Sequence, residues 1–131
     1  MDINGRNERT VVKGTSIGIW HPSGKKIAYY KGKSYNYSTY IMDLKTKETK
    51  LLISKKNNPS DWSPDGKYIN IVSTFFDMNG KRVKTEFKDI PTYGRFSPDG
   101  IKMVGGNLDI SYSKVGDEKE TVLLKDYSEK Y

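Results

Sequence analysis

The stretch that decides the fold is Trp62-Ser63-Pro64-Asp65-Gly66-Lys67, which recurs elsewhere in the chain. Related stretches are Phe96-Ser97-Pro98-Asp99-Gly100 and Trp20-His21-Pro22-Ser23-Gly24. Each copy has an aromatic residue, a Pro-x-Gly turn and then an apolar run. A repeat of this kind indicates one supersecondary unit that is used several times. Because the repeated residues form turns and core, the repeat predicts structural roles for them and not catalytic ones.

The spacing of two markers gives the repeat length. Trp20 and Trp62 are 42 positions apart, and Trp62 and Phe96 are 34 positions apart. A second marker is an aspartate between apolar residues, which occurs at Asp43 and Asp77, also 34 positions apart. Each aspartate precedes the next aromatic marker by 19 positions. Since two independent markers keep the same phase, the repeat spans the chain.

The repeat unit is predicted to be a set of short antiparallel strands. Its apolar runs are short, rich in β-branched and aromatic residues, and bounded by Gly, Pro, Asn and Lys. No stretch keeps a helical period over about twelve residues, so no helix is predicted. In Ser-Pro-Asp-Gly, Pro presets φ, the Ser hydroxyl bonds the local backbone, and Gly adopts positive φ.

Four antiparallel strands in about 40 residues are typical of one β-propeller blade. The sequence therefore predicts an all-β fold of four-stranded blades, about three and a half in number, in a single partial propeller domain over 1–131. The expected parts are a half blade at 1–12 and blades at 15–56, 57–91 and 92–131. Propellers generally close with about 4–8 blades. Self-association or missing blades are therefore needed to close the ring.

Composition excludes several function classes. The 131 residues suffice for one domain, and the absence of Cys excludes disulfides and thiolate metal sites. The net charge of +7 comes mainly from Lys, with only four Arg, whereas base recognition favours Arg, so nucleic acid is an unfavoured partner. No apolar run approaches the roughly 20 residues of a membrane span, and no signal peptide is visible at the N-terminus.

The repeated stretches resemble a known family. Trp62-Ser63-Pro64-Asp65-Gly66-Lys67 and Phe96-Ser97-Pro98-Asp99-Gly100 resemble the WD40-like, or PD40, repeat of TolB-like β-propellers, and Met42-Asp43-Leu44 is similar to its third strand. The resemblance implies a bacterial repeat protein that is periplasmic or extracytoplasmic and binds a protein. The same repeat occurs in propellers of prolyl-oligopeptidase-type serine peptidases, so a substrate-gating propeller is the alternative. Binding of acidic polysaccharide or nucleic acid is a weaker alternative.

The sequence predicts no catalysis by this chain. His21 is the only histidine, and the sister copies have Ser at its position, which favours a turn role. No Gly-x-Ser-x-Gly motif is present. Asp77-x-Asn79-Gly80 is interpreted as a hairpin turn in preference to a calcium loop, because Asn-Gly is a hairpin signature. We therefore expect no catalytic residue, no cofactor and no metal ligand.

Loops between the repeats are the predicted surface for recognition of a protein or a ligand, because binding residues concentrate on loops of rigid scaffolds. The connection between the second and third strands of the first blade is expected on the same face as the connections that lead into each new blade. Lys and Tyr side chains would gather there. The candidate residues are Lys31, Lys33, Tyr35, Tyr37, Lys55, Lys56 and Tyr93. The repeated aromatics Trp20, Trp62 and Phe96 are expected to pack between blades.

Overall fold

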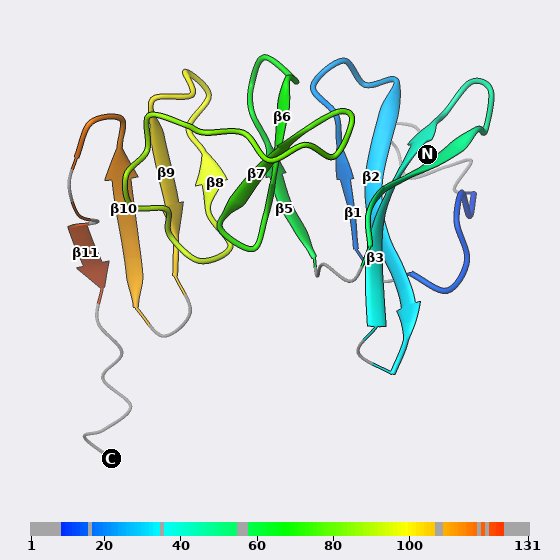
Figure 1. The fold of residues 1–131 in the computed structure, drawn as a ribbon, viewed down its shortest axis with the longest axis horizontal. Coiled ribbons are helices and arrows are strands. Elements are labelled where there is room, and N and C mark those ends of the chain that lie inside the picture. The colour runs from blue at the N-terminus through cyan, green and yellow to red at the C-terminus, as the bar shows by residue number, and fades with distance from the viewer. Residues whose placement is uncertain are drawn as a thin grey trace.

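The computed structural model describes residues 9–15, 17–34, 36–54, 58–106, 109–117, 119 and 121–124. These residues form eleven strands in three antiparallel sheets that stand side by side (Figure 1). The fold predicted from the repeat, a set of propeller blades in an incomplete ring, is confirmed. Within the described residues no helix is long and apolar enough to cross a membrane.

The first sheet has four strands in chain order. They are β1 (Gly18–Trp20), β2 (Lys26–Lys33), β3 (Asn36–Asp43) and β4 (Thr49–Ile53). A long hairpin joins β2 to β3, with Lys33 paired to Asn36 at its tip and Lys26 paired to Asp43 at its base. The expected half blade at 1–12 falls mostly on residues 1–8, which lie outside the described residues.

The second sheet has three strands, one fewer than the repeat predicts. They are β5 (Pro59–Trp62), β6 (Tyr68–Ile71) and β7 (Thr74–Asp77). Residues 81–91 make a single bridge to this sheet, between Arg82 and Phe76. The segment departs from the sheet edge because it buries Phe87 against the aromatic side chains that lie between the second and third sheets. Burial of an aromatic ring here replaces the fourth strand.

The third sheet has four strands, again in chain order from the inside outward. They are β8 (Arg95–Phe96), β9 (Lys102–Gly105), β10 (Ile110–Lys114) and β11 (Thr121–Leu124). The innermost strands of the three sheets, β1, β5 and β8, are neighbours. This is the arrangement of blades around a propeller axis.

The three Pro-x-Gly turns lie at one end of the sheets, which is called the turn end here and is the upper edge in Figure 1. In the second copy, the Ser63 hydroxyl donates to Asp65 Oδ1 at 2.6 Å, and the same oxygen accepts the Lys67 N–H at 3.0 Å. Gly66 completes this turn at a φ of 71°, in the left-handed region that favours glycine. The third copy repeats these bonds. In both copies the Ser hydroxyl oxygen also accepts the N–H two residues after the glycine, which confirms the predicted bond of Ser to the local backbone.

Two apolar clusters hold neighbouring sheets together. Between the first and second sheets the buried side chains include Ala28, Ile41, Trp62 and Ile69. Between the second and third sheets Phe75, Phe87 and Met103 are buried, with Phe96 partly buried beside them. The core of this protein therefore lies between sheets, as expected for a repeat array in which each unit contacts its neighbours.

Candidate binding site

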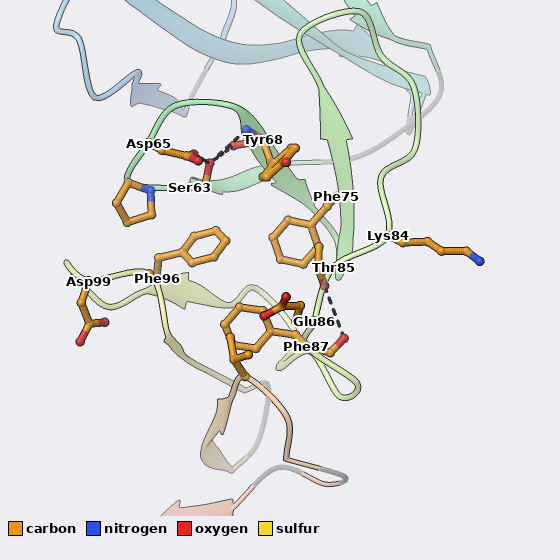
Figure 2. Close-up of a pocket in the computed structure, with 13 residues that line it drawn as sticks. Ser63, Asp65, Tyr68, Phe75, Lys84, Thr85, Glu86, Phe87, Phe96 and Asp99 are labelled. Carbon is orange, nitrogen blue, oxygen red and sulfur yellow. Dashed lines mark hydrogen bonds between the residues drawn. The ribbon is translucent and has the colours of Figure 1, made fainter.

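A pocket of about 490 Å³ opens between the second and third sheets at the turn end. Figure 2 shows its floor, where the rings of Phe75, Phe87 and Phe96 face one another. The ring centroids of Phe75 and Phe96 are 5.5 Å apart, and those of Phe87 and Phe96 are 6.0 Å apart. These distances are typical of aromatic rings in direct contact. The floor is thus a continuous apolar surface.

Three separate segments supply this aromatic floor. Phe75 comes from β7 and Phe96 from β8, where it is the third copy of the repeated aromatic. Phe87 comes from the segment that replaces the fourth strand. Its position is fixed by the backbone, because the Thr85 hydroxyl donates to the Phe87 carbonyl at 3.4 Å and the Gly116 N–H donates to the Glu86 carbonyl at 3.3 Å.

The rim of the pocket is polar and mainly acidic. Two Pro-Asp-Gly turns bring Asp65 and Asp99 to it, and the exposed Glu86 and Lys84 come from the facing segment. Lys84 points away from the three rings in Figure 2. An apolar floor with carboxylates at the rim suits an apolar side chain that has a cationic group next to it.

The rim carboxylates are stabilised in their ionised form. The Ser63 hydroxyl and then the Lys67 N–H hold the pKa of Asp65 below its usual value. The Ser97 hydroxyl and then the Ile101 N–H do the same for the pKa of Asp99. A carboxylate with a lowered pKa is a weak general base, so these groups supply charge and turn geometry and are poorly suited to proton transfer.

The described residues of the predicted binding surface lie at the opposite end of the sheets, which is called the loop face here. Lys31 and Lys33 are exposed near the tip of the β2–β3 hairpin. Tyr37 is half-buried, because its ring packs edge-on against Tyr30 at 5.1 Å. Tyr93 is exposed in the connection that leads into β8. Tyr35, Lys55 and Lys56 lie outside the described residues.

Strand registers bring these connections to the same end. β4 ends with Ile53 opposite Thr39, toward the tip of the β2–β3 hairpin, and β5 begins after the connection that follows. In the third sheet the Gly106 N–H donates to the Thr92 carbonyl at 2.9 Å, which joins the connection after β9 to the one before β8. The loop face is therefore separate from the phenylalanine pocket, which opens at the turn end.

Comparison with solved structures shows what this arrangement is similar to. The crystal structure of TolB from Acinetobacter baumannii matches with a TM-score of 0.72 and 26% identity, over 93% of this chain and 36% of that chain. The chain has a TolB-like β-propeller fold. A putative TolB from Agrobacterium tumefaciens matches with a TM-score of 0.60 and 18% identity, over 86% of this chain and 50% of that one.

The propeller domain of a peptidase is also similar in fold to this chain. The β-propeller domain of the Trilobed protease from Pyrococcus furiosus matches with a TM-score of 0.54 and 17% identity, over 88% of this chain and 45% of that one. That likeness is one of fold. No family model matches the sequence. The chain spans between about a third and a half of the length of these three structures. The family resemblance read from the repeated turns is confirmed.

In this TolB-like chain the conspicuous polar residues are tied into turns. His21 Nδ1 lies 2.8 Å from Ser23 Oγ, and its Nε2 lies 3.1 Å from the Gly66 carbonyl oxygen. Asp77 Oδ1 accepts the Asn79 and Lys81 N–H groups, which lowers the pKa of that carboxyl. The Nδ1 contact of His21 and the contacts of Asp77 match the turn roles that the repeat predicts, whereas the Nε2 contact of His21 reaches the turn of the second sheet.

The phenylalanine pocket of this TolB-like chain was not predicted from the sequence. The signal that could have found it is Phe87, a lone aromatic between Glu86 and Lys88 in a segment rich in charged residues. A large apolar residue in such a segment indicates burial against a neighbouring element. The sequence does not state which element that is, because Phe75 and Phe96 reach the pocket through the packing of two sheets.

Proposed function

We propose that the chain is a non-catalytic recognition module that binds a protein partner through its loop face. The observation that carries this proposal is the arrangement of the connections, since the strand registers gather them at one end of a rigid TolB-like scaffold. Lys31, Lys33 and Tyr93 present exposed side chains there. The TolB likeness supports a periplasmic setting for this role.

The chemistry of the loop face suits an acidic protein surface. Lysine side chains attract anionic partners and accelerate their association, and the chain as a whole carries a net charge of +7. An exposed tyrosine adds a large contact area at a low cost in conformational entropy. Together these features favour a protein partner with carboxylate groups around an aromatic-binding surface.

A non-catalytic role is supported by the state of the acidic residues. The pKa values of Asp65, Asp77 and Asp99 are lowered mainly by hydrogen bonds within their turns, and the pKa of Asp43 is lowered as well. For Asp43 the largest contribution comes from Lys26, whose Nζ lies 2.9 Å from Oδ2. General bases need a pKa near the working pH. The pKa values of these carboxylates are instead shifted away from neutral pH.

The test uses two charge-matched variants of the full chain. Lys31→Glu/Lys33→Glu reverses charge on the loop face, and Lys25→Glu/Lys45→Glu reverses the same charge at exposed positions of the turn end. Each immobilised protein is exposed to envelope proteins of the source cell, and retained proteins are identified. We expect a partner that wild type and the turn-end variant retain and the loop-face variant loses. Equal retention by the two variants would contradict the proposal.

A second candidate function is ligand binding in the phenylalanine pocket, which the apolar floor and acidic rim favour. The probes are two short peptides, one with Phe next to Lys and one with Phe next to Glu. Shifts of the Phe75 and Phe96 ring resonances on addition of the Lys peptide alone would support this function. Shifts that are equal for both peptides would exclude a role for the rim carboxylates.

A further inference from the structure

Each internal sheet boundary buries the same positions of the repeat. On the side that faces the preceding sheet, the repeated aromatic is the main anchor. Trp62 is only 3% exposed, and its ring lies edge-on to His21 of the first sheet with centroids 4.8 Å apart. Phe96, which is partly buried, packs against Phe75 and Phe87 of the second sheet. The aromatic of one sheet thus docks onto the sheet before it.

The turns repeat a second contact across each boundary. A Cβ added at Gly66 would lie 2.6 Å from His21 Nε2, and one added at Gly100 would lie 3.5 Å from Pro64 Cδ. Each turn therefore rests its glycine on the turn of the preceding sheet. This contact and the aromatic anchor together define one kind of boundary, which the chain forms twice.

Within the described residues, the first sheet presents the same two features with no partner sheet against them. Trp20, the first copy of the aromatic, is 65% exposed. Gly24, the first copy of the turn glycine, has no atom within 4 Å of an added Cβ. Exposure of a Trp side chain at a position that is buried in the next copy marks an uncovered docking surface.

The third sheet is uncovered on its other side, the side that would receive a following sheet. Val104 is 43% exposed, whereas Ala28 and Asn70 at the same repeat position are 0% exposed. Leu123 is 54% exposed, whereas Leu52 at the corresponding position of the first sheet is 7% exposed. The surface that buries the next aromatic anchor at internal boundaries is open at this end.

We propose that two copies of this chain associate head to tail and close a ring to which the described residues of each copy contribute three sheets. The Trp20 end of each copy docks on the Val104 and Leu123 end of the other, in continuation of the boundary that the chain already forms twice. A twofold axis relates the two new boundaries, so neither end of the described array remains open. Six sheets lie within the range of about 4–8 at which propellers close. This inference concerns the ends of the array and does not depend on the loop-face proposal.

The test is the mass of the full 131-residue chain in solution, measured by light scattering and sedimentation over a range of concentrations. We expect a dimer of about twice the 15.0 kDa chain mass, stable to dilution into the micromolar range. A chain that stays at 15.0 kDa at every concentration would overturn the proposal, and so would open-ended polymers.

Two variants distinguish head-to-tail closure from other dimers. Trp20→Lys damages one end and Leu123→Lys the other, so each variant alone has both ring boundaries damaged and should be monomeric. A mixture of the two retains one intact boundary, and we expect the mixture to dimerise where neither variant does. Val72→Lys, an exposed apolar position on the middle sheet, is the control and should remain dimeric. Loss of the dimer in only one end variant would indicate a like-to-like contact and overturn the ring.

A second measurement tests the ring if the Trp20→Lys or Leu123→Lys variant fails to fold. The chain has no cysteine, so Gly24→Cys/Pro98→Cys introduces a single pair at the positions that repeat the Gly100–Pro64 contact. Under oxidation the double variant should form a covalent dimer closed by two bonds. The two single variants should not form this species. Only monomer in the oxidised double variant would count against the ring.

Discussion

Turn glycines in this chain have two roles: they allow a positive φ, and they allow neighbouring sheets to approach closely. Gly66 and Gly24 distinguish these roles. Both adopt a positive φ, 71° and 68°, which disfavours any side chain. At Gly66 an added Cβ would also collide with the His21 ring, whereas Gly24 has open space. A side chain would therefore strain the backbone at both positions. Of the two, only Gly66 lies close to a neighbouring sheet.

The first prediction follows from this pair. Gly24→Ala should lower the free energy of unfolding by about 1–2 kcal/mol, the cost of a left-handed Ala. Gly66→Ala should lower it by a larger amount, because the His21 ring must also move. The measurement is urea unfolding of both variants, followed by Gly66→Ala in a His21→Ala background. If the excess cost of Gly66→Ala persists without the ring, the contact is not its cause.

A second prediction concerns acid. The folded pKa values of Asp65 and Asp99 lie below the ordinary value of 3.8, so the unfolded chain binds more protons near that pH. Their contribution to stability is therefore present above about pH 4 and is lost as the pH falls through the folded pKa values. Asp65→Asn/Asp99→Asn keeps the oxygen acceptors and removes the titration. Urea unfolding from pH 6 down to pH 2.5 should show a shallower acid decline for the double variant than for wild type, and equal slopes would refute the assignment.

At the scale of the strands, the second sheet is where the structure differs from the sequence prediction. The apolar runs and Pro-x-Gly turns were sufficient to predict short antiparallel strands in each repeat, because strand and turn signals are local. The missing fourth strand was not predictable in this way. Segment 81–91 leaves the sheet edge to bury Phe87 against Phe75 and Phe96, and that contact depends on the packing of the third sheet. The pocket was missed for the same reason.

A third prediction tests this segment. Phe87→Ala should cost about 3–5 kcal/mol of unfolding free energy, as for other buried aromatics, because it removes the ring that joins residues 81–91 to the sheet boundary. Hydrogen exchange should show faster exchange of the Val83 N–H, which donates to the Phe75 carbonyl at 2.9 Å. The Ser63 N–H, which bonds the Tyr68 carbonyl across the neighbouring turn, is the internal control. Unchanged exchange at Val83 would show that the backbone bond holds the segment without the ring.

Considered as a whole, the molecule is an array in which stability comes from boundaries between sheets. The marker spacing was sufficient to predict the array and its open state, since both follow from counting units. The spacing does not identify which side chains become exposed at the ends, because Trp20 and Trp62 are equivalent in sequence and differ in their neighbours. Position in the array, and not residue type, decides that Trp62 is core and Trp20 is surface.

The last prediction compares one repeat position in two places. Leu52 is buried at an internal boundary, and Leu123 occupies the same position at the open end. Leu52→Ala should cost about 2–5 kcal/mol at any protein concentration, whereas Leu123→Ala in dilute solution should cost within about 0.5 kcal/mol. At high concentration the two costs should converge, because a second copy covers Leu123 and mass action then links association to folding. Urea unfolding of both variants at two protein concentrations measures this. A cost of Leu123→Ala that is independent of concentration would mean that this position stays uncovered, and the array would then function as an open arc.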